Sequence, residues 1–305
     1  AQAVEVTKLS LLLTVLEGEA RELKGKQLDF HRVLPDLGHN IKCGNSLIGS
    51  DFYAQPNLPD FDEEARFKIN AFDWEIEFKP IMAAGGFDAV IGNPPYLGGR
   101  EWKEENGRQY DFFVQHFSVA DYQFDIYALF FEQAVRLARR HGFVGFITPN
   151  TWLNNQSCLK LRRFLVEQTS VLAIADYSRE KVFADAVVLP VVSILCKGAK
   201  SDNRVAIWTP VDQKITHMRD VAQRLWARDE NLIFNLDLSE EEAALRDRMY
   251  RLGVPLRSLA VVKFGIKLYE TGRGTPPQRA DAATNHIFES DRKIDSSYRR
   301  YLEGK

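Results

Sequence analysis

The run Asn93-Pro94-Pro95-Tyr96 holds the residues best suited to chemistry in this 305-residue chain. It directly follows "FDAVIG" (87–92), a short apolar run rich in β-forming residues, which predicts a buried strand that ends at Gly92. Two adjacent prolines cannot continue a strand ladder and begin few helices, so they hold their neighbours in a rigid turn. We therefore expect Asn93 and Tyr96 to be presented in fixed positions at the end of this strand.

The side-chain oxygen of Asn93 and the carbonyl oxygen of Pro94 are hydrogen-bond acceptors that are too weakly basic to act as general bases. They suit a planar NH2 group, which offers two donor hydrogens. Accepting both bonds draws the nitrogen toward a tetrahedral shape and restores its lone pair. Tyr96 can stack on the ring that carries the amine, and the prolines fix the geometry at low entropic cost. The four residues indicate a site that makes a ring amine or an amide nucleophilic, and the alternative is a purely structural turn.

The segments that follow alternate between helix and strand patterns. "DIYALFFEQAVRLARRHG" (125–142) predicts a helix with Asp125 near its N-terminus, Arg139 and Arg140 in its last turn, and Gly142 as its stop. Asp125 is interpreted as a helix cap. Within this helix, Tyr127 and Phe131 are assigned to the core. The remaining patterns predict a strand over 143–149, a helix over 158–168 and strands over 171–177 and 187–198.

This alternation predicts an α/β fold with a doubly wound, mostly parallel sheet and a final antiparallel strand. Ligands of such sheets bind at the carboxyl ends of the strands, where Asn93 lies. A short strand is expected over 41–43, loops over 51–86, and an inserted loop or lid over 97–124. "LSEEEAALRDRMYRLG" (238–253) predicts an amphipathic helix, and Ser239 and Glu242 form its capping box.

Composition sets broad limits on the function. The chain is 45% hydrophobic and 27% charged with a net charge of -2, so it has no global basic field for nucleic acid. The chain has three cysteines that lie far apart and form no CxxC motif, namely Cys43, Cys158 and Cys196. We therefore expect them to be small buried residues in a protein of a reducing compartment. The six histidines show no metal-ligand spacing, so no metal site is predicted. No signal peptide or membrane span is indicated, which predicts a cytoplasmic protein.

Three collinear segments resemble adenine-specific DNA methyltransferases of the TaqI-type group, including those fused with restriction activity. They are "FDAVIGNPPY" (87–96), the helix 125–142 and "GFVGFITPNTWL" (142–153). The resemblance covers most of the chain and implies the fold of the S-adenosylmethionine-dependent methyltransferases. It implies S-adenosyl-L-methionine as cofactor and double-stranded DNA as partner. The implied reaction is direct methyl transfer to the N6 amine of an adenine flipped out of the duplex.

The resemblance also implies a role for each site residue. Asn93, Pro94, Pro95 and Tyr96 form the catalytic loop, and Tyr96 and Phe183 flank the target base. Asn45, Ser46 and Asn93 contact the cofactor. The alternative for Phe183 is a core position, and the alternative for Asn45 and Ser46 is a tight turn closed by an Asx bond.

The family's glycine-rich cofactor turn precedes the position where this chain begins, so the resemblance implies that the N-terminal strands are missing. We expect a catalytic domain at 1–200, a helical connector at 201–255, and the start of a target-recognition domain at 256–305. A restriction or specificity module, fused or separate, is a further expected partner.

Two other functions stay open. The NPPY chemistry also suits a methyltransferase that acts on protein glutamine or on RNA, and cytosine N4 is an exocyclic amine as well. A DNA-binding or assembly component without activity of its own is the alternative from another class.

Overall fold

The computed structural model describes residues 2–22, 37–54, 62–121, 124–178, 188–200, 202–212, 214–260, 277–279 and 281. The chain divides into two compact units, Ala1–Ala243 and Ala244–Lys305. The first unit contains the whole described sheet and the Asn93–Tyr96 loop, so the site is built within that unit.

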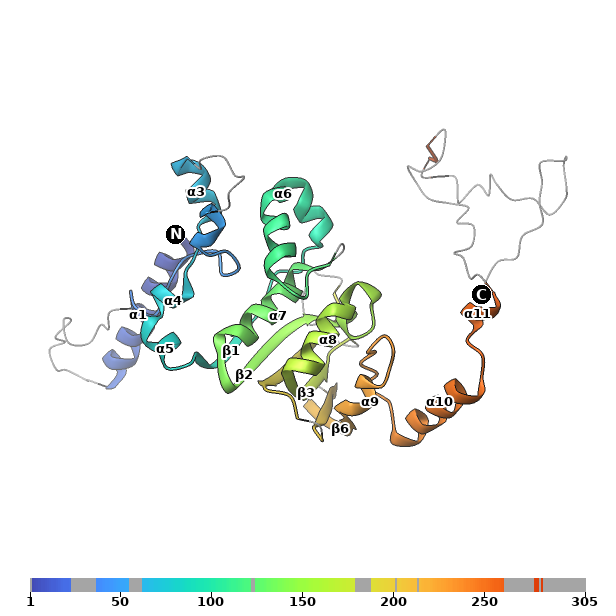
Figure 1. Cartoon of the computed structure of the whole chain (residues 1–305). Helices are drawn as coiled ribbons and strands as arrows, with labels where there is room; N and C mark the ends of the chain where they lie inside the picture. Colours follow the sequence, from blue (N-terminus) through green and yellow to red (C-terminus); the bar gives the residue numbers. More distant parts are fainter. Residues whose placement is uncertain are drawn as a thin grey trace. The chain divides into compact units, whose positions relative to one another are not determined.

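A six-stranded sheet in the order β1-β2-β4-β3-β5-β6 forms the centre of the first unit (Figure 1). Its strands β1 and β2 pair in parallel, as do β3 and β5, while β4 runs antiparallel between β2 and β3. The predicted α/β fold with a mostly parallel sheet is therefore confirmed, including the antiparallel late strand. The bounds are β1 Phe87–Gly92, β2 Ala138–Pro149, β3 Thr169–Asp176, β4 Pro190–Lys197, β5 Arg204–Val211 and β6 Lys214–Ala222.

Two helices connect the strands and pack on one face of the sheet. Helix α7 (Ile126–Leu137) packs on β1 and β2, and α8 (Leu159–Gln168) packs on β3. The expectation that Arg139 and Arg140 end the helix is wrong, because both residues belong to β2. Ala138 is fully buried and pairs with Phe87 of β1. From this residue on, strand pairing with β1 outweighs the helical propensity of the sequence.

The other face of the sheet carries exposed apolar side chains. Ile91 and Ile194 lie on either side of Gly145 in β2, and they are 84% and 42% exposed. Strand β1 lies at the sheet edge, and among the described residues it pairs with β2 alone. The prediction that 87–92 is a buried strand is therefore wrong for the described chain. Continuous apolar runs are typical of strands that are covered on both faces, whereas the described residues cover only one face of β1.

The segments flanking β1 are more helical than the sequence predicts. Residues 41–43 form no strand, and Asn45 makes an isolated bridge with Ala71. The expected loops over 51–86 and 97–124 contain helices. One of them, α3 (Glu63–Ile69), begins at an N-cap, where the Asp62 carboxylate accepts from the Ala65 amide at 2.8 Å. These helices are η1 Ser50–Ala54, α3 Glu63–Ile69, α4 Trp74–Glu77, α5 Lys79–Ala83 and α6 Gly99–His116.

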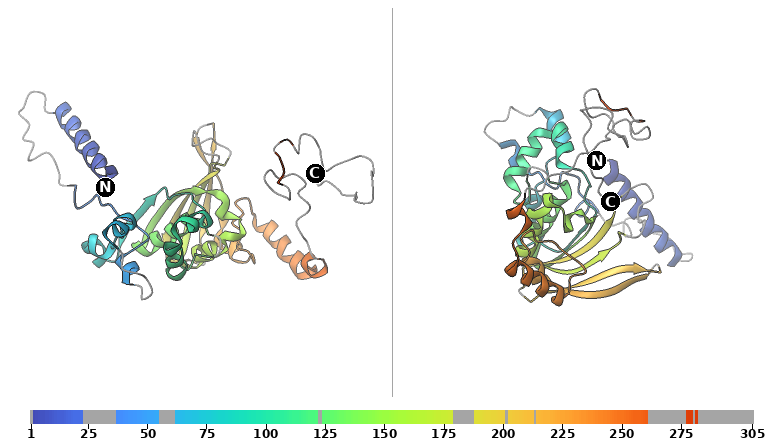
Figure 2. Two further views of the ribbon diagram at one scale, coloured as in Figure 1. Left: turned by 90° about the horizontal axis from the view of Figure 1, so that it is seen from above. Right: turned by 90° about the vertical axis from the view of Figure 1, so that its right-hand side faces the viewer.

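Residues 201–255 differ from the expected helical connector in their first part. The β5–β6 hairpin extends the sheet beyond β3 (Figure 2), and α9 (Gln223–Ala227) follows it. Helix α10 (Glu240–Leu252) is confirmed together with its capping box: Ser239 N–H donates to Glu242 at 2.9 Å, and Glu242 N–H donates to the Ser239 hydroxyl at 3.1 Å. Helix α11 (Leu256–Leu259) comes next, and most of the expected 256–305 domain lies outside the described residues.

The N-terminal segment forms helix α1 (Gln2–Glu22). No helix in the described ranges is both long and apolar enough to cross a membrane. Of the three cysteines, Cys158 is buried, as expected. The expectation of burial is wrong for Cys43, which is exposed, and Cys196 is half-buried on β4.

Candidate active site

The Asn93–Tyr96 loop is anchored at both ends. Upstream, Gly92 pairs with Phe146 of β2. Downstream, the Leu97 carbonyl accepts from the Ile126 amide at 2.9 Å, and the Gly99 amide donates to the Phe124 carbonyl at 2.7 Å. A Cβ at position 99 would lie 2.5 Å from that carbonyl oxygen, so this joint requires glycine. The loop is thus held between the end of β1 and the start of α7.

Within the loop, Tyr96 and Asn93 contact each other. The Tyr96 hydroxyl lies 2.6 Å from Asn93 Oδ1 and 3.2 Å from the carbonyl oxygen of Ile147 on β2. Burial raises the pKa of the Tyr96 phenol, so the hydroxyl is protonated and acts as a donor at neutral pH. Pro94 is buried, whereas Asn93 is exposed. The amide of Asn93 is therefore accessible while its neighbour is packed into the protein.

A cavity of about 240 Å3 opens beside this loop, and we call it the loop cavity. Val90, Phe130 and Phe146 give it apolar walls, and Asn93 and Pro94 lie at one side. Apolar aromatic walls with a few polar groups are typical of sites for flat heteroaromatic ligands. The loop that carries the candidate chemistry therefore adjoins a cavity suited to a planar ring.

One stripe of α7 lines the loop cavity, and the sequence interpretation missed it. Phe130, Gln133, Ala134 and Leu137 all face the cavity. Their spacing of i, i+3, i+4 and i+7 is the signal that they share one helix face. The same spacing is typical of a core stripe, and the sequence cannot separate the two uses. The neighbouring Phe131 is fully buried, as predicted.

Ser46 lines the loop cavity, and Asn45 forms a turn. The Asn45 Oδ1 atom accepts from the Leu47 amide at 3.1 Å, which is the Asx turn that was the alternative for this position. A second cavity of about 330 Å3 shares four lining residues with the first, namely Ser46, Trp74, Gln133 and Leu137. The structure thus brings Ser46, but not the Asn45 side chain, to the cavity beside Asn93.

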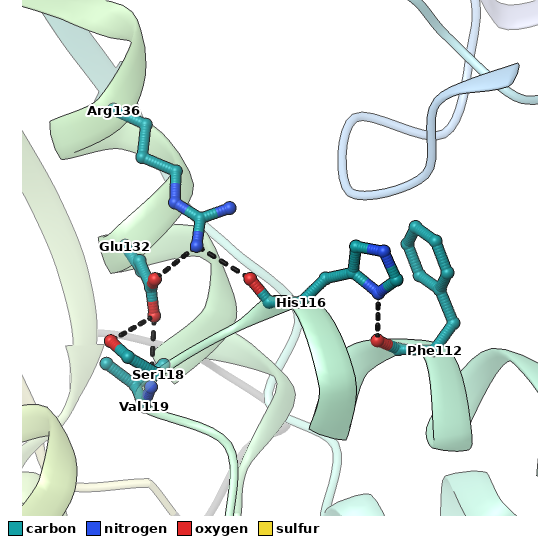
Figure 3. Close-up of polar contacts among 6 residues, drawn as sticks. All are labelled: Phe112, His116, Ser118, Val119, Glu132 and Arg136. Atoms are coloured by element: carbon teal, nitrogen blue, oxygen red, sulfur yellow. Dashed lines mark hydrogen bonds and ion pairs between the residues drawn. The ribbon is translucent and has the colours of Figure 1, made fainter. Parts of the chain in front are cut away.

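A buried carboxylate fixes the far end of α6 onto α7 (Figure 3). Glu132 is 2% exposed, and its Oε2 atom accepts from the Ser118 hydroxyl and the Val119 amide, each at 3.0 Å. Its Oε1 atom pairs with Arg136, which also donates to the His116 carbonyl at 2.7 Å. The turn after α6 is thereby attached to the same helix that lines the loop cavity.

The remaining predicted site positions have separate outcomes. Asp125 occupies the N-cap position of α7, but its side chain makes no capping bond there. Burial raises the pKa of its carboxyl, with a smaller contribution from Glu101. Tyr127 is buried, as predicted, and its hydroxyl lies 3.2 Å from the Thr151 hydroxyl. Phe183, the predicted second base contact, lies outside the described residues.

Curated relatives of this chain are restriction-modification proteins. It is 31% identical over 181 residues to the type II restriction enzyme and methyltransferase RM.Eco57I of Escherichia coli, a match that spans 59% of this chain and 16% of that protein. It is 28% identical over 169 residues to the putative type II restriction enzyme and methyltransferase RM.MjaORFECS2P of Methanocaldococcus jannaschii, across 54% of this chain and 13% of that protein.

A solved structure, the type IIG restriction endonuclease BpuSI, matches with a TM-score of 0.38 and 16% identity over 54% of this chain and 22% of that one. The chain therefore spans less than a quarter of the length of each of these three proteins. The model of the Eco57I restriction-modification methylase family matches residues 1–183, which is more than half of the chain. This protein belongs to the Eco57I restriction-modification methylase family.

Proposed function

We propose that this chain is part of an enzyme that methylates the exocyclic N6 amine of a flipped adenine in double-stranded DNA, with S-adenosyl-L-methionine as methyl donor. The enzyme would serve a restriction-modification or phage-defence system. One observation carries the proposal: Asn93 and Tyr96 stand on a loop anchored at both ends, beside a cavity with aromatic walls. Family membership supports it.

In the proposed reaction, Asn93 Oδ1 and the Pro94 carbonyl accept the two hydrogens of the target amine. These bonds make the nitrogen lone pair available to form a bond to the methyl group. The methyl group would leave the sulfonium of the donor, and the methylated amine would release one proton to solvent. Tyr96 stacks on the flipped base, with Phe183 proposed on its other face. Flipping costs a few kcal/mol, and stacking on an aromatic side chain offsets about 1–3 kcal/mol of it. The anchored loop holds the amine in a fixed position. Alignment of the amine with the methyl group then supplies much of the rate acceleration.

The loop cavity is the proposed place of the adenosyl part of the cofactor, and the chemistry of its lining supports this. Phe130 and Phe146 offer apolar surface for a purine, and Ser46 and Asn93 offer polar groups beside it. Asn45 is proposed to act through its backbone, because its side-chain oxygen is held in the Asx turn. When bound, S-adenosyl-L-methionine supplies an electrophilic methyl group on its sulfonium.

Labelled methyl transfer tests the proposal. The chain, and separately the longest reading frame that contains it, is incubated with labelled S-adenosyl-L-methionine and offered duplex DNA, RNA or protein extract. We expect label in duplex DNA. Because the chain spans a small share of its relatives, activity in the longer protein alone agrees with the proposal.

Other outcomes select the alternatives. Label in RNA, or in glutamine of protein, keeps the NPPY chemistry and overturns the proposed substrate. A folded longer protein that binds DNA without transferring label supports the DNA-binding or assembly role.

A further inference from the structure

We propose that the Tyr96 hydroxyl is a positioning group that fixes which end of the Asn93 side-chain amide faces the target base. This inference deepens the proposed function and rests on it for its kinetic consequence. The role is separate from ring stacking, which a phenylalanine would perform equally well. The hydroxyl and the ring of Tyr96 therefore have different functions in the loop.

The distances around the Tyr96 hydroxyl indicate that it donates its proton to Asn93. A phenol has one proton, and two oxygens lie within reach: Asn93 Oδ1 at 2.6 Å and the Ile147 carbonyl at 3.2 Å. The shorter distance lies at the strong end of the range for O–H···O bonds, while the longer one lies beyond it. The proton is therefore assigned to Asn93. The raised pKa of the phenol keeps that proton in place at neutral pH.

An asparagine amide has two unlike ends, an accepting oxygen and a donating NH2 group. The side chain of Asn93 is exposed, and Tyr96 is its one side-chain partner among the hydrogen bonds of the described residues, so little else defines its orientation. With its proton turned to Asn93, the hydroxyl attracts the oxygen end of the amide. The NH2 end would be held only if the proton turned to the Ile147 carbonyl, which lies at the longer distance of 3.2 Å and forms the weaker bond. Tyr96 thus selects one of two orientations related by rotation of about 180° about the terminal bond.

This selection matters because the wrong orientation would disable the proposed site. A carbonyl-type oxygen has two lone pairs, so Oδ1 can accept from Tyr96 and still accept from a base amine. If the amide turned over, its NH2 group would face the amine of the base, donor against donor.

The test compares Tyr96→Phe with wild type in the longest reading frame that contains the chain. Loss of one net hydrogen bond, about 0.5–1.5 kcal/mol, predicts a methyl-transfer rate about 2- to 12-fold lower in single-turnover assays. Base flipping, followed by 2-aminopurine fluorescence at the target position, should stay at the wild-type level because the ring is retained. Tyr53→Phe is the matched control, since it removes a hydroxyl bonded to the Arg66 carbonyl at 3.3 Å. A Tyr96→Phe rate within twofold of wild type overturns the inference.

A second measurement needs no activity. In 15N-labelled protein, the side-chain NH2 of Asn93 should give one pair of sharp resonances. In Tyr96→Phe, that pair should broaden or split as the amide samples both orientations. An unchanged pair overturns the inference even if the rate falls. If the wild-type protein transfers no methyl group at all, the proposed function fails while this measurement still decides the role of the hydroxyl.

Discussion

At the residue scale, the proposed chemistry rests on neutral groups rather than on acids and bases. Asn93 and Pro94 can accept hydrogen bonds from an amine, and Tyr96 combines an aromatic face with a donor hydroxyl. These groups were recognisable from the sequence because they are adjacent in it. The Ile147 partner of Tyr96 is 51 residues away, so only the fold reveals that contact.

Replacing Asn93 by alanine tests the amide directly. We expect Asn93→Ala to lower single-turnover methyl transfer at least about a hundredfold, since losing one preorganised hydrogen-bonding group typically costs that much. Asn40→Ala, at an exposed asparagine outside both cavities, serves as the control and should retain activity. Near-normal turnover by Asn93→Ala would remove Asn93 from the mechanism.

Replacing Tyr96 by alanine tests the ring. Tyr96→Ala should weaken the 2-aminopurine flipping signal and raise the dissociation constant for target DNA about 5- to 100-fold, as expected for a lost base–aromatic stack of about 1–3 kcal/mol. Tyr96→Phe should preserve both. Equal losses in the two variants would show that the hydroxyl, not the ring, holds the base.

At the element scale, the buried Glu132 carboxylate attaches the turn after α6 to α7. Its ion pair with Arg136, whose side chain is 46% exposed, has a counterpart at the same i, i+4 spacing in which both partners are exposed. Glu132→Ala should lower the free energy of unfolding by about 1–3 kcal/mol, because the buried Val119 amide loses its acceptor, whereas Arg136 and the Ser118 hydroxyl can turn to water. Glu64→Ala removes an exposed partner of Lys68 and should cost less than about 1 kcal/mol. Urea denaturation of both variants measures the difference, and equal losses would contradict the anchoring role.

Helix α10 should respond to pH through its capping box. The Ser239 backbone N–H, and then its hydroxyl, hold the pKa of Glu242 below its usual range. A carboxyl with a lowered pKa stabilises the folded form above its unfolded value, about 4.3, and that stabilisation is lost as pH falls through the folded value. Hydrogen exchange of the α10 amides, corrected for intrinsic rates, should therefore accelerate below about pH 4. Glu242→Gln keeps an acceptor without a charge, so a pH response equal to wild type would refute this origin.

At the scale of the whole molecule, the alternation of patterns was enough to predict the α/β sheet and its antiparallel late strand. The sequence could not predict that Arg139 enters a strand, because the pairing of Ala138 with Phe87 is a long-range contact. Nor could it predict the exposure of Ile91, since burial depends on which elements cover a strand. For the candidate site, the Asn93–Tyr96 loop was predictable from the sequence. The place of Phe130 in the cavity wall was not, because core residues of the same helix show the same spacing.

The central claim is that the Asn93–Tyr96 loop serves methylation of an adenine amine in DNA. The most direct test is to treat duplex DNA with S-adenosyl-L-methionine and the longest reading frame that contains this chain, digest it to nucleosides, and identify the methylated product by mass spectrometry. The account predicts N6-methyladenine that disappears with Asn93→Ala. Methylation at cytosine N4, or N6-methyladenine that persists in the Asn93→Ala variant, would contradict it.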